Sequence, residues 1–218
     1  MEWHRLSIWI KGRVIVKMAG GNGSDAAGTF GAASRSRARY IAQTGVIAGT
    51  YAAVTLIALL FLQGLAWGPI QFRVSEALCV VALFTPAAIP GLTIGCVLAN
   101  LINTVISGTG ALGLLDVFFG SAATFIGAVL CWRLRKHPAL AIGSFVLTNA
   151  LIVPMYLPLL LQGLGFYVIP FTDISIDGAF LPMYLFGVIS IGIGEALVIY
   201  VLGYPLSKLL RDNWKAIA

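Results

Sequence analysis

The sequence has 218 residues, of which 59% are apolar and only 10% are charged. Soluble domains carry roughly 45–50% apolar and about 25% charged residues, so this composition excludes an ordinary soluble fold and fits a lipid bilayer. The net charge of +6 does not indicate nucleic-acid binding, because the basic residues flank apolar stretches and form no stripe interleaved with aromatic residues.

The N-terminal residues 1–34 mix apolar and basic side chains and then become rich in Gly, Ala and Ser. No apolar run among them is long enough to cross a membrane, and no signal-peptide cleavage pattern follows. We expect this segment to be a disordered extension, or in part the product of an upstream start. Residues 35–218 are expected to form the membrane domain.

The first expected span, residues 41–62, is almost uncharged and close to the length of about 20 residues that a helix needs to cross the hydrocarbon core. The next segment, 68–84, begins with a Gly-Pro pair and carries Arg73 and Glu76 before it becomes fully apolar. This pattern predicts a second span that is short or partly re-entrant.

Four more apolar stretches follow, and together they predict an all-α integral membrane protein built as a bundle of six transmembrane helices. Pro154 and Pro158 predict a kink in the fifth span, and Gly203 and Pro205 predict a break or an end in the sixth. The four stretches are residues 90–106, 114–134, 139–161 and 181–203.

The basic residues indicate the orientation of these spans. Of the fourteen Lys and Arg, seven precede residue 40, three lie at 133–136 and three at 208–215, while Arg73 stands alone. Cytoplasmic loops of membrane proteins carry an excess of Lys and Arg. Six crossings place all three groups and both termini in the cytoplasm, whereas five crossings would separate them.

Ionisable residues inside apolar spans cost about 2.5–3.5 kcal/mol each on insertion scales, so each is a candidate functional residue. Arg73 and Glu76 are three residues apart and could neutralise one another on one helix face. Alternatively, together with Gln71, they line a cavity beside a broken backbone. Two further carboxylates, Asp116 and Glu195, lie in the fourth and sixth spans.

Polar amides and aromatic side chains complete the predicted ligand-binding set. Asn100 and Asn149 lie in the third and fifth spans, where an amide either contacts ligand or joins two helices. Tyr156, Phe118 and Phe119 are the nearest aromatic side chains. The predicted ligand-binding residues are Gln71, Arg73, Glu76, Asn100, Asp116, Asn149, Tyr156 and Glu195.

Small residues recur in the first span at the spacing of one helix face. Such residues let another helix approach closely. They serve either packing within this chain or docking of a second subunit. The residues are Gly45, Gly49 and Ala53, with Ala48 and Ala52 on a neighbouring strip.

Catalytic and nucleotide-binding motifs are not recognisable in the sequence. The glycine-rich segment 20–25 lacks the Lys and the Ser or Thr of a phosphate-binding loop. His4 and His137 lie outside the spans, and the three cysteines have no metal-ligand spacing. We therefore expect a protein that is not an enzyme and holds no metal or cofactor, with any ATPase on a separate chain.

Five stretches of residues 40–210 resemble the QueT family. This is the queuosine-precursor transporter group among the substrate-capture (S) components of energy-coupling factor (ECF) importers. The stretches are GPIQFRVSEAL (68–78), FTPAAIPGLTIGCVLANLI (84–102), GLLDVFFGSAATFIGAVL (113–130), TNALIV (148–153) and GIGEALVIYVLGYPL (192–206).

The resemblance implies a six-helix S component in a prokaryotic cell membrane, surrounded by lipid, that captures a 7-deazaguanine-type queuosine precursor from outside. It also implies docking, through the small-residue face of the first span, on a transmembrane coupling subunit driven by two ATPase subunits. A different class remains open, in which the chain alone is a secondary transporter driven by an ion gradient. The sequence does not decide which base is captured.

Overall fold

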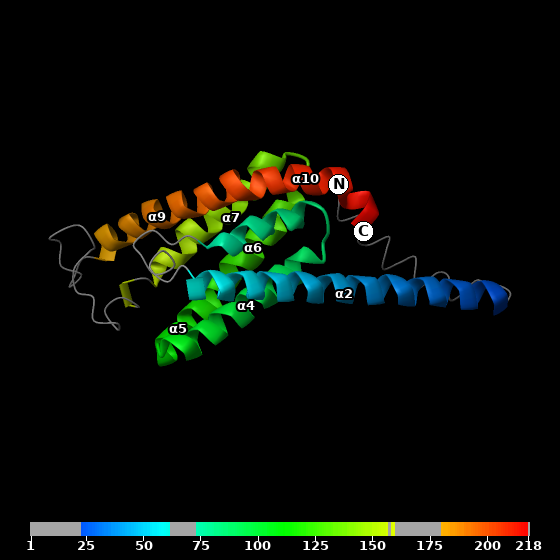
Figure 1. Cartoon of the computed structure of the whole chain (residues 1–218), viewed down its shortest axis with the longest axis horizontal. Helices are drawn as coiled ribbons and strands as arrows, with labels where there is room; N and C mark the ends of the chain where they lie inside the picture. Colours follow the sequence, from blue (N-terminus) through cyan, green and yellow to red (C-terminus); the bar gives the residue numbers. More distant parts are fainter. Residues whose placement is uncertain (1–22, 62–72, 157, 160–179, 218) are drawn as a thin grey trace. The chain divides into compact units, whose positions relative to one another are not determined.

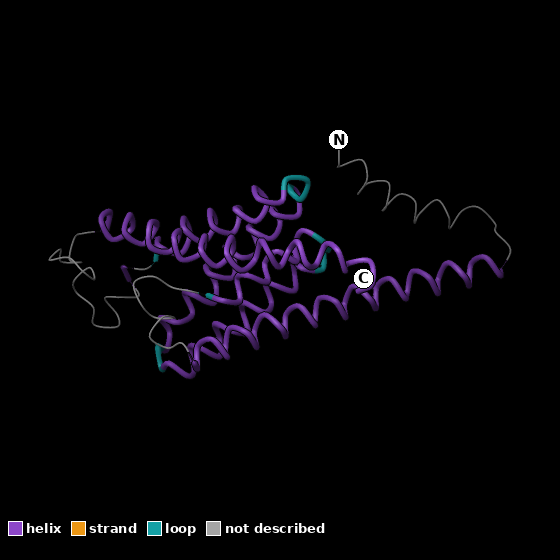
Figure 2. The backbone as a smooth tube through the Cα atoms, turned by 45° about the horizontal axis from the view of Figure 1, so that its top comes forward, coloured by secondary structure: helices purple, strands orange, loops and turns teal. Residues whose placement is uncertain are grey.

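The computed structural model describes residues 23–61, 73–156, 158–159 and 180–217. The chain divides into two compact units, Met1–Tyr40 and Ile41–Ala218, and the second unit carries the predicted site. Every element in the described residues is a helix or a short connection (Figure 2). The expected disorder of residues 1–34 stays a prediction, and residues 1–22 lie outside the described part.

Most helices are continuous runs of apolar residues, as the sequence predicts. Five runs are long and apolar enough to cross a membrane: Ser36–Phe61, Ala88–Ser107, Gly110–Arg133, Pro138–Met155 and Phe180–Asn213. Their elements are α2 (Gly23–Phe61), α4 (Ala88–Ser107), η2 (Gly110–Leu112), α5 (Gly113–Leu115), η3 (Asp116–Gly120), α6 (Ser121–Arg133), α7 (Pro138–Ile152), η4 (Val153–Met155), α9 (Phe180–Leu197), η5 (Val198–Gly203) and α10 (Tyr204–Ile217).

The predicted second span is the short helix η1 (Val74–Leu83), a 3-10 helix of ten residues. A helix needs about 20 residues to cross the hydrocarbon core, so η1 does not reach that length by itself. The all-helical membrane bundle is confirmed with five long helices and this short one. The count of six crossings stays a prediction.

Within the second unit, successive helical segments run in alternating directions (Figure 1). The part of α2 after Ile41 and α4 run one way, and η1 lies between them in sequence and runs the other way. As a result, the connection between α6 and α7, residues 134–137, and the helix α10 lie at the same end of the bundle (Figure 1). Residues 107–113 lie at the opposite end.

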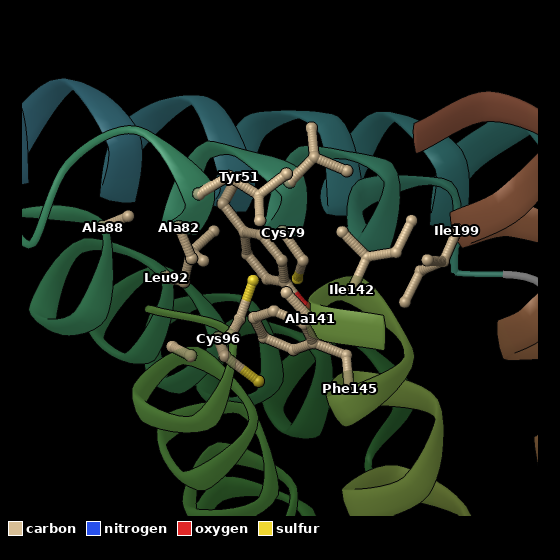
Figure 3. Packing of buried hydrophobic residues seen from close by; sticks show 14 residues of the cluster. Tyr51, Cys79, Ala82, Ala88, Leu92, Cys96, Ala141, Ile142, Phe145 and Ile199 are labelled. Carbon is tan, nitrogen blue, oxygen red and sulfur yellow. The ribbon is translucent and has the colours of Figure 1, made fainter. Parts of the chain in front are cut away.

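The hydrophobic core is built around η1, which packs against α4, α6, α7, η5 and α10. Its side chains Cys79, Val80 and Ala82 are at most 1% exposed. Because η1 is buried on several sides, most of its residues are apolar, and it lacks the alternation of apolar and polar faces of a surface helix. Figure 3 shows the core side chains gathered beneath η1 and α2, among them Tyr51, Cys79, Leu92, Cys96, Ile142 and Phe145.

Helices α2 and α4 approach so closely that two α4 positions have no room for a side chain. A Cβ atom on Gly91 would lie 2.9 Å from the Ile47 Cβ, and one on Gly95 would lie 2.8 Å from the Ala48 carbonyl oxygen. Small residues at a spacing of four permit this contact. The first span is therefore fixed to the bundle through glycines of the third.

The two predicted proline irregularities occur as changes of helix type. Helix α7 ends at Ile152, and the 3-10 turn η4 contains Pro154. In the last span, the π-helical segment η5 ends at Gly203, and α10 then continues to Ile217. Because Pro205 has no N–H, it cannot donate to the carbonyl of Val201. The span is interrupted there but does not end.

Candidate functional site

A connected network of polar side chains joins η1, α4 and η3. Arg73 precedes η1 with an extended backbone, φ −87° and ψ 91°. Its guanidinium Nη2 donates to Asn100 Oδ1 at 2.6 Å, and Asn100 Nδ2 donates to the backbone carbonyl of Asp116 at 3.0 Å. Asn100 is only 2% exposed, so it acts here as a buried bridge between a cation and a helix carbonyl.

The network continues through the Asp116 side chain to an aromatic pair. The Tyr156 hydroxyl donates to Asp116 Oδ1 at 2.5 Å. The Tyr156 ring stacks on Phe119, with centroids 5.5 Å apart and planes inclined by 26°. Arg73, Asn100, Asp116 and Tyr156 therefore form one set, which we call the Arg73 network.

The helix around Asp116 is not a regular α-helix. Residues Asp116–Gly120 form the π-helical segment η3, a distortion found frequently at functional sites. A Cβ atom on Gly120 would lie 3.3 Å from Asn100 Nδ2 and 3.9 Å from the Tyr156 hydroxyl. The absence of a side chain at Gly120 thus keeps the polar atoms of the Arg73 network close to bare backbone.

Glu76 has hydrogen-bond partners other than Arg73, and the neutralisation of Arg73 by Glu76 stays a prediction. Its side chain is 0% exposed. The Tyr51 hydroxyl donates to Glu76 Oε1 at 2.5 Å, and Cys79 Sγ donates to Oε2 at 2.9 Å. Burying a carboxylate requires such donors, and here they come from α2 and from η1 itself.

A second polar contact joins α7 to α9. Asn149 Nδ2 donates to Glu195 Oε1 at 2.7 Å, and the two side chains are 3% and 4% exposed. We call this contact the Asn149–Glu195 pair. Asn149 Oδ1 is buried and has no hydrogen-bond partner among the described residues.

The structure thus places seven of the eight predicted ligand-binding residues in three hydrogen-bonded groups: the Arg73 network, Glu76 with its two donors, and the Asn149–Glu195 pair. Gln71, the eighth, lies outside the described residues. Phe118 is 70% exposed, whereas Phe119 stacks on Tyr156. Among the described residues, no group of three or more His, Cys, Asp or Glu side chains is placed to hold a metal ion.

Sequence reasoning missed Tyr51 and Cys79, the two donors to Glu76. Tyr51 is hidden among apolar residues of the first span, and the sequence around Cys79 favours a small hydrophobic role for the thiol. A signal for Tyr51 exists, because Thr44, Ala48, Tyr51 and Thr55 recur at helical spacing. This spacing predicts that the four side chains share one side of the helix, which faces the protein interior and is partly polar.

The small residues of α2 separate into two strips. Ala48 and Ala52 are buried, 5% and 8% exposed, and belong to the packing within this chain. Gly45, Gly49 and Ala53 are exposed, and a Cβ atom on either glycine would meet no described atom within 4 Å. We call these three residues the open strip.

The peripheral position of α2 agrees with this division. Of its span, 22% is buried, compared with 39–50% in the other four long helices. The open strip therefore lies on a helix with an unusually large free surface, beside lipid-exposed side chains such as Val46 and Ile57.

Comparisons with known proteins agree with this architecture. The chain is 31% identical over 92 residues to the queuosine precursor transporter QueT of Lactococcus lactis subsp. cremoris (strain MG1363). These residues cover 42% of this chain and 48% of that protein, so the match spans about half of its length. No solved structure matches the chain. The model of the QueT transporter family matches residues 41–212, and the chain therefore belongs to the QueT transporter family.

Proposed function

We propose that this protein is the substrate-binding S component of an ECF-type importer and captures a queuosine precursor of the 7-deazaguanine type. The observation that carries the proposal is the Arg73 network. It places a guanidinium, an amide, a carboxylate and a stacked aromatic pair together inside an otherwise apolar bundle. The name of the Lactococcus relative supports the choice of ligand.

The chemistry of a deazaguanine ring fits these groups. Its guanine-type edge offers N–H donors beside a carbonyl acceptor. Asp116 can accept from the donors through its second carboxylate oxygen, and Arg73 can donate to the carbonyl. Phe119 and Tyr156 provide aromatic faces for a planar ring. An apolar bundle with a few convergent polar groups is the usual form of a small-molecule site.

The distribution of charge supports entry from outside the cell. The segment α5, which Asp116 directly follows, lies at the end of the bundle opposite the connection between α6 and α7 (Figure 1). By the positive-inside rule, the end with this basic connection faces the cytoplasm. Both termini are then cytoplasmic, and Asp116 lies on the side of the outer surface of a prokaryotic cell membrane.

This orientation can be tested by thiol labelling of intact cells. A cysteine at Ser107, which is exposed, should react with a membrane-impermeant reagent, whereas one at exposed Lys136 should not. The native cysteines that the structure describes are buried, and the unmodified protein measures their background. Labelling at position 136 from outside would reverse the proposed orientation.

The open strip supports the proposed partners. Gly45, Gly49 and Ala53 would let a helix of a transmembrane coupling subunit approach the α2 backbone closely. Since the sequence carries no phosphate-binding loop, ATP hydrolysis belongs to two separate ATPase subunits. The S component itself contributes ligand capture.

Uptake in cells tests the proposal. Cells that express this chain together with a coupling subunit and two ATPases should accumulate labelled 7-aminomethyl-7-deazaguanine. Cells with a hydrolysis-deficient ATPase, or without the coupling subunit, should not. Equal uptake by this chain alone, abolished by a protonophore, would instead identify a secondary transporter.

A further inference from the structure

A chain of hydrogen bonds links the first span to the Arg73 network. The Tyr51 hydroxyl of α2 donates to Glu76 Oε1 at 2.5 Å, and the Glu76 backbone N–H donates to the Arg73 carbonyl at 2.9 Å. The Arg73 guanidinium then donates to Asn100 on α4. Glu76 is therefore the one residue that stands between Tyr51 and Arg73 in this chain of bonds.

Arg73 needs such support because it precedes an unusual helix. The segment η1 is a 3-10 helix of ten residues, and 3-10 runs longer than about three to four residues are uncommon. The Arg73 side chain does not cap this helix. In the first turn, the Glu76 side chain bonds to α2 and its backbone bonds to Arg73. The position of Arg73 is thus coupled to that of Glu76.

Tyr51 touches both elements that the Arg73–Asn100 bond joins. Its side chain is 1% exposed, and its hydroxyl bonds to η1 through Glu76. A Cβ atom on Gly95 would lie 3.0 Å from the Tyr51 Cβ, so the base of the side chain packs directly on α4. Tyr51 therefore lies between the helix that follows Arg73 and the helix that carries Asn100.

The Glu76 side chain is already occupied by protein donors. It is 0% exposed, Oε1 accepts from Tyr51, and Oε2 accepts from Cys79 Sγ at 2.9 Å. Tyr51 can donate to Oε1 whether Glu76 is ionised or holds a proton on its other oxygen. Two satisfied oxygens on a fully buried side chain fit a group that holds structure rather than one that contacts a ligand.

We propose that Tyr51 and Glu76 are positioning residues, which hold Arg73 on Asn100 and do not contact the ligand themselves. This inference rests on the proposed function and deepens it, because it assigns part of the support of the binding site to α2. The role of Glu76 then depends on the reach of its side chain and on its acceptor oxygen, and not on its charge.

Two substitutions of Glu76 separate reach from charge. Glu76→Gln keeps the length of the side chain and an oxygen for Tyr51, and its Nε2 can donate to Cys79 Sγ. Glu76→Asp keeps the charge but withdraws the carboxylate by one methylene group. Calorimetric titration of the purified full-length chain with 7-aminomethyl-7-deazaguanine compares them. We expect Glu76→Gln to bind within about threefold of wild type and Glu76→Asp to bind about tenfold more weakly.

Tyr51→Phe tests the same contact from α2. It keeps the ring and removes the hydroxyl, and it should weaken binding about tenfold at a temperature at which the variant is folded. The control is Tyr200→Phe, which removes a hydroxyl that donates to the Ala139 carbonyl at 2.9 Å and should leave the affinity within about threefold of wild type. A merely structural role of Tyr51 would lower thermal stability without changing the affinity of folded protein.

Several results would overturn the inference and leave the proposed function intact. They are equal affinities of the two Glu76 variants, the opposite order of these affinities, wild-type affinity in folded Tyr51→Phe, or an equal loss in Tyr200→Phe. The Glu76 variants decide the question if Tyr51→Phe does not fold, and Tyr51→Phe decides it if one of them does not. If folded wild-type protein does not bind the ligand, the proposed function itself fails.

Discussion

The two faces of α2 carry similar small residues but lie in different surroundings. On the inward face, the Ala48 backbone touches the position of Gly95 on α4, and Tyr51 reaches Glu76. On the outward face, a Cβ atom added to Gly45 or Gly49 would meet no described atom within 4 Å. The spacing of small residues therefore predicts that another helix approaches closely, but it does not identify which helix does so.

The inward face finds its partner within the chain because α4 offers complementary glycines. Gly91 and Gly95 are four residues apart, and Cβ atoms added to them would meet Ile47 and the Ala48 backbone, respectively. No described element offers such a surface to the open strip. The inward face therefore serves folding, whereas docking on the outward face is our proposal, and substitutions at adjacent residues can separate the two roles.

The largest effect is expected for Ala48→Leu. Ala48 is buried, and its backbone lies so close to α4 that a Cβ atom added to Gly95 would lie 2.8 Å from the Ala48 carbonyl oxygen. Overpacking of a close contact costs about 1–3 kcal/mol, and occasionally more. We expect a lower melting temperature in detergent and a parallel loss of ligand binding and uptake. Wild-type stability would show that α2 does not depend on its contact with α4.

Gly49→Leu places the same side chain one residue further along, on the open strip. Since no described atom lies within 4 Å of a Cβ at this position, thermal stability and ligand affinity of the isolated chain should stay near wild type. Uptake with the partner subunits should be abolished, because the larger side chain keeps a partner helix at a distance.

Val46→Leu is the control for this substitution, since Val46 is 68% exposed and outside the open strip. It should leave uptake unchanged. If Gly49→Leu lowered binding and uptake together, the open strip would serve packing within this chain, and the docking proposal would be wrong.

A smaller effect is expected for Tyr51→Phe on the inward face. The change removes the hydroxyl that donates to Glu76 Oε1 and leaves that oxygen without this donor, at a cost of about 1–3 kcal/mol. Thermal unfolding should show the loss. Tyr200→Phe removes a hydroxyl bonded to the Ala139 carbonyl on a side chain that is 41% exposed, and it should cost less. Equal losses of stability in the two variants would mean that the hydrogen bond from Tyr51 to Glu76 stabilises the fold no more than an exposed hydrogen bond does.

Much of the fold could be predicted because apolar run length and proline position act locally. The five long helices and the interruptions at Pro154 and Pro205 follow from those signals. Residues 68–84 were predicted as a short or partly re-entrant span, and the described part of this segment contains the ten-residue helix η1. Its central position could not be predicted, because it depends on tertiary contacts with α4, α6, α7, η5 and α10.

The sequence indicates candidate site residues but not how they pair. Ionisable groups stand out in any apolar span, which identified Arg73, Asp116 and Glu195. Their partners depend on tertiary contacts, such as that of Asn149 with Glu195, 46 residues away. The pairing of Arg73 with Glu76 looks simplest from spacing alone, yet Arg73 bonds to Asn100.

Ligand titration of the Asp116→Asn variant tests the central claim most directly, because Asp116 joins the ring-binding groups of the Arg73 network. The purified wild-type chain should bind 7-aminomethyl-7-deazaguanine with one ligand per chain. Asp116→Asn, which keeps the shape of the side chain but loses its charge, should bind about tenfold more weakly, the cost of one unpaired buried group. Wild-type affinity in the folded variant would contradict the account and place the ligand away from the Arg73 network.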